Sequence, residues 1–186
     1  MPFPAQTQTI PRSAARWRPL VIALGGAALI TLGAKVQIPF WPVPMTLHTL
    51  AVFTLAAALG PRLGMVTMVT YLAAGAMGLP VFSGTPERGI GLAYMAGPTG
   101  GYLLGYLLAA GVIGWLAQGR GALGQALAML TGLAVVYAAG LLWLAGFVPP
   151  SGLLAAGFAP FILGDLVKVA LASGLLAAMR RLKGRG

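Results

Sequence analysis

The residues best suited to chemistry in this sequence are an acid and a base three positions apart, Asp165 and Lys168. They lie deep inside the last long apolar segment, and Asp165 is one of only two acidic residues among the 186 of the chain. A spacing of i, i+3 places both side chains on one face of a helix. A charge at the centre of a bilayer costs about 2.5–3.5 kcal/mol on insertion scales, so such residues usually face a cavity or one another. The pair predicts a polar site within a membrane; the alternative is a self-neutralising pair that only fixes helix packing.

The composition is that of a membrane protein. Hydrophobic residues make up 59% of the chain, charged residues 8%, and the mean hydropathy is +0.90. A soluble domain carries roughly a quarter charged residues. The net charge is +10, but Lys and Arg gather at the ends of apolar segments, where they determine topology, rather than in a patch with aromatics that would indicate nucleic acid binding. The absence of cysteine excludes disulfides and thiolate chemistry.

The apolar segments predict an all-α membrane protein with six transmembrane helices. We expect a basic cytoplasmic tail at residues 1–18, a single six-helix membrane domain at 19–183 and a short cytoplasmic tail at 184–186. A cleaved signal peptide at the first apolar segment is less favoured, because further apolar segments follow. The expected spans are Leu20–Ala34, Thr46–Leu59, Leu63–Leu79, Pro98–Leu116, Leu123–Val148 and Leu153–Met179.

The basic residues orient these spans. Six spans place both termini on one side, together with nine of the Lys and Arg residues, whereas only Lys35 and Arg88 lie on the other side. The positive-inside rule therefore predicts that both termini are cytoplasmic. The three connections rich in Pro or Gly then face outward, and the acid–base pair lies in the outer half of the last span. This arrangement predicts a binding cavity that opens to the outside.

Two of the outward connections have features of a binding site. The second span is short and follows a Pro-rich stretch, so that stretch is expected to fold inward. The Gly-rich loop from Val81 to Gly91 has the length of a lid. It leads to Thr99, Gly100 and Gly101, which open a helix whose N-terminus suits an anion, although this glycine run lacks the Lys of a P-loop. His48 is the only histidine, which indicates a hydrogen-bonding residue rather than a metal site.

Four motifs, in this order, carry a resemblance to a known family. They are Val43-Pro44-x-Thr46, Gly78-Leu79-Pro80-Val81-Phe82, Gly97-Pro98-Thr99-Gly100-Gly101-Tyr102-Leu103-x-Gly105 and Pro160-Phe161-x-x-Gly164-Asp165-x-x-Lys168. From about Leu20 to Leu182 the chain resembles the bacterial biotin transporter BioY family, the substrate-binding S components of energy-coupling factor (ECF) transporters. One departure is His48, where the family more often has Gln.

The resemblance implies a six-helix S component that captures biotin from outside with high affinity, in the cytoplasmic (inner) membrane of a bacterium. It implies no enzyme and no cofactor. ATP would be hydrolysed only by partners, two ABC-type ATPases joined to a membrane coupling subunit, since this sequence has no Walker motif. Some family members occur without that module. Transport by this protein without ATPase partners, and its assembly as a homo-oligomer, are therefore alternatives. Ala23 and Ala27 resemble the small-residue pattern by which S components dock on the coupling subunit; the alternative is packing within the chain.

The resemblance also implies roles for the candidate site residues. Asp165 would accept from the ureido N–H groups of biotin and Lys168 would donate to the ureido oxygen, or instead to the valerate carboxylate. The carboxylate would otherwise meet Arg88 or the backbone amides of residues 99–101. Aromatic rings would hold the apolar part of the ligand. The predicted substrate-binding residues are Asp165, Lys168, Phe82, Gly84, Arg88, Thr99, Gly100, Gly101, Tyr102 and Phe161.

Other classes of function fit the residues less well. An enzyme needs a nucleophile and a base within the membrane, and no Ser/His/Asp spacing supplies them. A proton- or ion-coupled carrier of small molecules would use Asp165 as its relay, but the segment pattern shows no inverted repeat. A purely structural membrane subunit would not require the buried pair or the lid-like loop.

Overall fold

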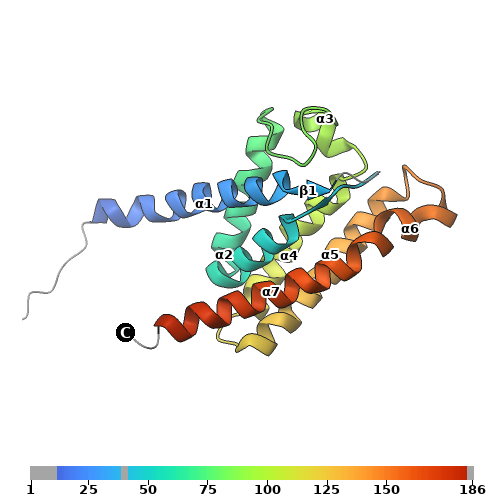
Figure 1. Ribbon diagram of the computed structural model, residues 1–186. Helices are drawn as coiled ribbons and strands as arrows, with labels where there is room; N and C mark the ends of the chain where they lie inside the picture. The colour runs from blue at the N-terminus through green and yellow to red at the C-terminus, as the bar shows by residue number, and fades with distance from the viewer. Residues whose placement is uncertain (1–11, 39–41, 184–186) are drawn as a thin grey trace, which may run out of the picture.

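The computed structural model describes residues 12–38 and 42–183 (Figure 1). Most of the expected N-terminal tail, the middle of the Pro-rich connection and the expected C-terminal tail lie outside these residues. Helix α1 begins at Arg12, inside the segment expected as a tail. The elements are α1 (Arg12–Lys35), β1 (Gln37–Ile38), β2 (Met45–Thr46), α2 (His48–Ala76), α3 (Gly91–Ala96), α4 (Gly100–Leu116), α5 (Ala122–Leu144), η1 (Pro150–Gly152), α6 (Leu153–Gly157) and α7 (Ala159–Lys183).

The predicted fold of six apolar helices is confirmed, with two of them joined in α2. Gly60 interrupts α2 with a φ of +79°, a conformation that suits glycine, and Pro61 follows it. The two halves of α2 match the second and third expected spans, and α1, α4, α5 and α7 match the others. Among the described residues, four helices, with α2 counted once, are long and apolar enough to cross a membrane, and α4 is a shorter apolar helix.

The Pro-rich connection contains structure that the sequence did not predict. Its two arms pair as a short antiparallel ladder, with Gln37 opposite Thr46 and Ile38 opposite Met45. Beyond the ladder, residues 42–44 are buried. The connection therefore folds inward, as expected, but it is held by backbone pairing.

Glycines bring α4 and α5 into close contact. A Cβ on Gly101 would lie 2.2 Å from Cβ of Trp143, and one on Gly105 would lie 2.8 Å from Cα of Val136. On the facing side, a Cβ on Gly140 would meet the ring of Tyr102 at 2.4 Å. Small residues on both faces allow two membrane helices to approach this closely.

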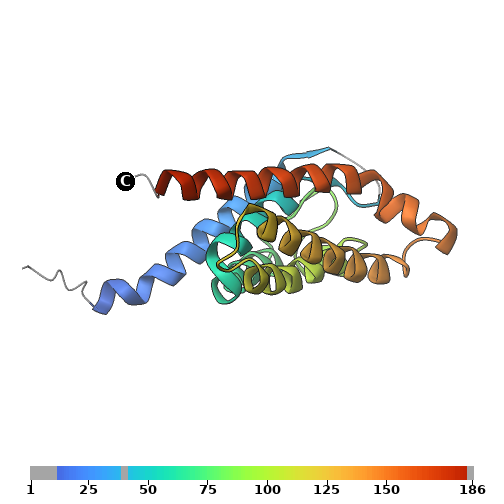
Figure 2. The same cartoon turned by 90° about the horizontal axis from the view of Figure 1, so that it is seen from below.

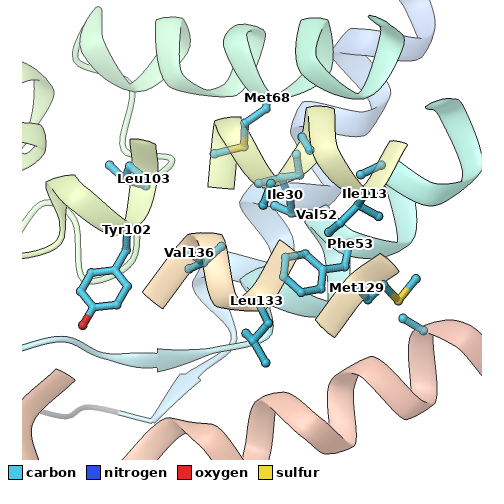
Figure 3. Packing of buried hydrophobic residues seen from close by; sticks show 14 of the residues in the cluster. Ile30, Val52, Phe53, Met68, Tyr102, Leu103, Ile113, Met129, Leu133 and Val136 are labelled. Atoms are coloured by element: carbon cyan, nitrogen blue, oxygen red, sulfur yellow. The ribbon is translucent and has the colours of Figure 1, made fainter. Parts of the chain in front are cut away.

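The apolar core joins α1, α2, α4 and α5. Figure 3 shows side chains from these four helices meeting in one cluster, with Tyr102 and Leu103 at one end of it. Helix α7 adds buried apolar residues to the same cluster and lies along the outside of the bundle (Figure 2). Buried core residues labelled in Figure 3 are Ile30, Val52, Phe53, Met68, Ile113, Met129, Leu133 and Val136.

The irregular connections meet at one end of the bundle. Lys35 Nζ donates to the backbone oxygen and the hydroxyl of Thr85, at 3.0 and 2.9 Å. Trp143 Nε1 donates to the carbonyl of Gly97 at 2.9 Å, which ties α5 to the segment before α4. At the opposite end, Arg180 donates to the carbonyl of Arg120. The beginning of α1 and the end of α7 lie toward one side in both views (Figures 1 and 2). The fold thus separates an end with long connections from an end with short turns.

Candidate binding cavity

A cavity lies among the helices beneath the long connections. It has about 610 Å³ of empty space, its open mouth included. The centre of a water molecule can reach only about 60 Å³ of it, so the walls stand close together. Its lining consists of Val43, Pro44, Thr46, His48, Thr49, Tyr71, Ser83, Tyr94, Thr99, Tyr102, Leu103, Tyr106, Val136, Tyr137, Phe161, Asp165 and Lys168.

One ion pair forms the polar centre of this cavity. Lys168 Nζ donates to Asp165 Oδ1 at 2.9 Å, and the Tyr137 hydroxyl donates to Asp165 Oδ2 at 2.7 Å. The side chains of Lys168 and Asp165 are 14% and 8% exposed. Helices α7 and α5 therefore hold the carboxylate from two sides. An ammonium has three N–H donors, so Lys168 can also donate to a ligand acceptor in the cavity.

Aromatic rings and hydroxyl groups form much of the remaining wall. The ring of His48 stacks on Tyr106, with centroids 4.5 Å apart and planes at 18°, and meets the ring of Tyr71 edge-on at 5.2 Å. The hydroxyls of Thr49 and Tyr106 share a hydrogen bond of 2.6 Å. These contacts fix the orientation of the rings that face the cavity.

His48 also has an unpaired ring nitrogen. The residue is 5% exposed, and its Nε2 finds no hydrogen-bond partner in the part of the chain that the structure describes. Leaving a buried polar atom unpaired costs about 1–3 kcal/mol, so an exception of this kind calls for an explanation. A ligand bound in the cavity that His48 lines would supply the missing hydrogen-bond partner.

Five of the predicted site residues line the cavity. Besides the ion pair, these are Thr99, Tyr102 and Phe161. The Tyr102 hydroxyl donates to the carbonyl of Gly157 at 2.7 Å, which joins α4 to the end of α6. Its ring is thereby fixed beside the cavity.

Four other predicted residues do not belong to the lining. Phe82 is fully buried behind it, where its ring stacks on Tyr94 at 4.9 Å and meets Tyr71 edge-on at 5.5 Å. Gly84 has a φ of +70° in the loop, and a Cβ there would lie 2.7 Å from Cδ of Arg88. Gly100 and Gly101 pack α4 against its neighbours. The geometry gives these residues a supporting position behind or beside the cavity.

Arg88 lines a neighbouring hollow. Its Nη1 donates to the carbonyl of Pro42 at 3.2 Å, which joins two long connections. This hollow shares Tyr94 and Thr99 with the main cavity. Arg88 therefore stands next to the cavity, on the side of its mouth formed by the connections.

The sequence reasoning missed most of the tyrosines. All five tyrosines of the chain line the cavity, although they come from α2, α3, α4 and α5. A phenol hydroxyl needs a partner when it is buried in apolar surroundings. Tyrosines within apolar spans were therefore a signal that pointed to a polar interior. The list is Tyr71, Tyr94, Tyr102, Tyr106 and Tyr137.

The small-residue face of α1 packs within the chain. Ala23 and Ala27 are 0% and 8% exposed. Between them, a Cβ on Gly26 would lie 2.5 Å from the side chain of Thr67 on α2. A partner could reach the two alanines only if α1 moved away from α2.

Comparison with known proteins identifies the family. Residues 6–185 match the family model described as BioY family. The chain belongs to the BioY family. The biotin transporter BioY of Thermotoga maritima is 39% identical over 158 residues, covering 84% of this chain and 92% of that protein. The biotin transporter BioY of Rhodobacter capsulatus is 40% identical over 173 residues, covering 84% and 89%.

A solved structure shares the fold. It is described as the crystal structure of the S-component for biotin from an ECF-type ABC transporter. Its TM-score against this chain is 0.79, with 25% sequence identity, and the match covers 93% of this chain and 95% of that one. These relatives are transporters and a transporter component, so the chain is a multi-pass protein of the bacterial inner membrane and not an enzyme.

The ion pair predicts a specific pattern of stability. We expect Lys168→Met to lower the free energy of unfolding by about 3 kcal/mol, because it leaves the buried carboxylate without its countercharge. The double variant Asp165→Asn/Lys168→Met should recover most of this loss, because no charge then remains buried. Unfolding of the detergent-solubilised protein measures both. Val167→Met, at a neighbouring position that is 59% exposed, is the control. A Lys168→Met variant as stable as this control would contradict the prediction.

Proposed function

We propose that this protein takes up biotin across the cytoplasmic membrane, binding it with high affinity in the cavity around Asp165. The observation that carries the proposal is the ion pair of Asp165 and Lys168, held by Tyr137 inside a cavity lined mainly by aromatic rings and hydroxyl groups. The names of the relatives support biotin as the ligand.

The chemistry of biotin is complementary to this cavity. Its ureido group has two N–H donors and one carbonyl acceptor, which match the carboxylate of Asp165 and the ammonium of Lys168. Charge-assisted hydrogen bonds of this kind are stronger than neutral ones and strict in their geometry. The fused rings of biotin fit against Phe161, Tyr102 and the ring of Tyr106. A ligand without the ureido pattern would forgo these charge-assisted hydrogen bonds, so the site would bind it more weakly.

The valerate tail then extends toward the long connections. Thr99 lies in the lining, and Arg88 stands in the hollow next to it, so the carboxylate is placed best near these two residues. Gly84, Gly100 and Gly101 support this region, and Phe82 supports the aromatic wall. In the alternative the carboxylate meets Lys168, whose remaining N–H groups can donate to the carboxylate or to the ureido oxygen.

The direction of capture follows from the distribution of charge. Most basic residues lie at the end with the short turns, which the positive-inside rule assigns to the cytoplasm together with both termini. The cavity then opens outward through the long connections. Energy would come from a coupling subunit and two ABC-type ATPases, which the likeness to an S-component supports. Docking through Ala23 and Ala27 would require α1 to separate from α2.

Binding of biotin tests the proposal directly. We expect the purified, biotin-free protein to bind labelled biotin tightly in detergent. Asp165→Asn and Lys168→Met should each weaken binding about 10- to 100-fold, because each removes a hydrogen bond to a charged group. Val167→Met, which changes an exposed neighbour on the same helix, should bind as the unchanged protein does. Tight binding retained in both site variants would reduce the pair to a packing role, and a folded protein that does not bind would remove biotin as the ligand.

The position of the carboxylate predicts a difference between two ligands. Arg88→Gln should weaken the binding of biotin about fivefold or more but leave the binding of biotin amide unchanged, because the amide carries no charge for Arg88 to neutralise. Titration calorimetry with both ligands gives the comparison. If Lys168 holds the carboxylate instead, the discrimination between acid and amide survives in Arg88→Gln and disappears in Lys168→Met.

The unpaired nitrogen of His48 predicts a further effect on affinity. His48→Phe keeps a ring that can stack on Tyr106 but removes the ring nitrogens, so we expect biotin to bind about 3- to 10-fold more weakly. His48→Gln returns a polar group to a similar place and should stay within about threefold of the unchanged protein. Competition binding with labelled biotin measures both variants. Equal affinity in His48→Phe would show that this nitrogen does not contact the ligand.

A further inference from the structure

A second cavity lies at the opposite end of the bundle. It is bounded by the bend in α2 at Gly60, the turn at residues 117–121, the first turn of α5 and the last turns of α7. Its empty space is about 770 Å³, mouth included, and the centre of a water molecule can reach about 320 Å³ of it. It is therefore wider than the first cavity, and no part of the proposed biotin site reaches it.

One buried polar atom in this second cavity has no partner. Gln125 is 5% exposed, and its side-chain oxygen accepts no hydrogen bond from the residues that the structure describes. Its backbone N–H donates to Gly121, so the residue is fixed in the first turn of α5. An unpaired buried acceptor indicates a donor supplied from outside the chain.

The rim of the second cavity is positively charged. The guanidinium of Arg180 donates to the carbonyls of Leu176 and Arg120, which holds its charge at the cavity. The chain contains only two acidic residues. Asp165 is paired with Lys168, and Glu87 lines the hollow beside Arg88 at the other end. No carboxylate of the chain is therefore available at this rim, which favours an anion supplied from outside.

Much of the remaining wall of the second cavity is apolar, and Gln118 adds one further polar side chain. Leu176 and Met179 of α7 line it, together with residues 57–60 of α2. Met179 is 45% exposed, so the apolar wall continues to the surface of the bundle. Helices α2 and α7 cross the membrane, and basic residues at their ends mark the boundary between the apolar layer and water. This cavity therefore suits an amphiphilic molecule.

We propose that this second cavity binds the headgroup of an anionic phospholipid that carries hydroxyl groups, such as phosphatidylglycerol. Arg180 neutralises the phosphate, a headgroup hydroxyl donates to Gln125, and an acyl chain lies along Leu176 and Met179. Basic pockets between transmembrane helices bind anionic headgroups by the same physical principle. An ethanolamine headgroup supplies a donor but adds a positive charge, and a choline headgroup supplies no donor, so neither meets both requirements.

Lipid titration of the detergent-solubilised full chain tests this proposal. Native mass spectrometry would compare phosphatidylglycerol, phosphatidylethanolamine and phosphatidylcholine, with glycerol 3-phosphate as the free headgroup. We expect phosphatidylglycerol to bind most tightly. Arg180→Gln and Gln125→Leu should each weaken it about fivefold, which corresponds to one basic residue or one hydrogen bond. Arg181→Gln removes the same charge at the adjacent position, outside the cavity lining, and should stay within about twofold of the unchanged protein.

Several results would overturn the proposal. Equal weakening in Arg180→Gln and Arg181→Gln would indicate diffuse attraction to a basic surface. Equal binding of phosphatidylethanolamine, or no effect of Gln125→Leu, would contradict a site in which Arg180 binds the phosphate and Gln125 accepts from a headgroup hydroxyl. Glycerol 3-phosphate that binds as tightly as the lipid would make the ligand a free phosphate ester. If Arg180→Gln weakened only assembly with a coupling subunit, the cavity would be a protein-docking site. Arg180 is exposed, so its variant does not depend on repacking of the core.

Discussion

The burial of the Asp165 carboxylate determines how the helices around it must pack. Asp165 lies in an apolar bundle, where a lone charge is far too costly to keep. The ammonium of Lys168, one turn along α7, and the phenol of Tyr137 on α5 together satisfy both of its oxygens. That arrangement works only if α7 and α5 are held in register. The contacts that fix these helices are therefore also the contacts that shape the cavity.

Close packing by glycine holds α5 against α4. Because Gly101, Gly105 and Gly140 let α4 and α5 approach closely, Tyr102 and Tyr106 of α4 reach the cavity that Tyr137 lines from α5. The same phenol groups bind across the bundle, as Tyr102 does to Gly157. Hydroxyl groups inside the apolar interior thus serve twice, since they join the helices and also give the cavity its polar edge.

The sequence predicted the parts of this arrangement that depend on local patterns. Hydropathy predicted the spans, and the spacing of Asp165 and Lys168 predicted a shared helix face. It did not predict which distant side chains meet. Tyr71, Tyr94 and Tyr137 come from different helices, and only packing in three dimensions brings them together. For the same reason the sequence did not show that the glycines at 100 and 101 also bring α4 close to its neighbours.

The distribution of charge connects the two ends of the molecule. Both acidic side chains lie toward the end with the long connections, where Asp165 is neutralised within the chain. The end with the short turns has arginines and no acidic residue of the chain to balance them. At the end with the long connections, the basic residues are therefore largely balanced by acidic residues of the same chain. The other end has an excess of positive charge, and such an end favours contact with anionic groups at a membrane surface.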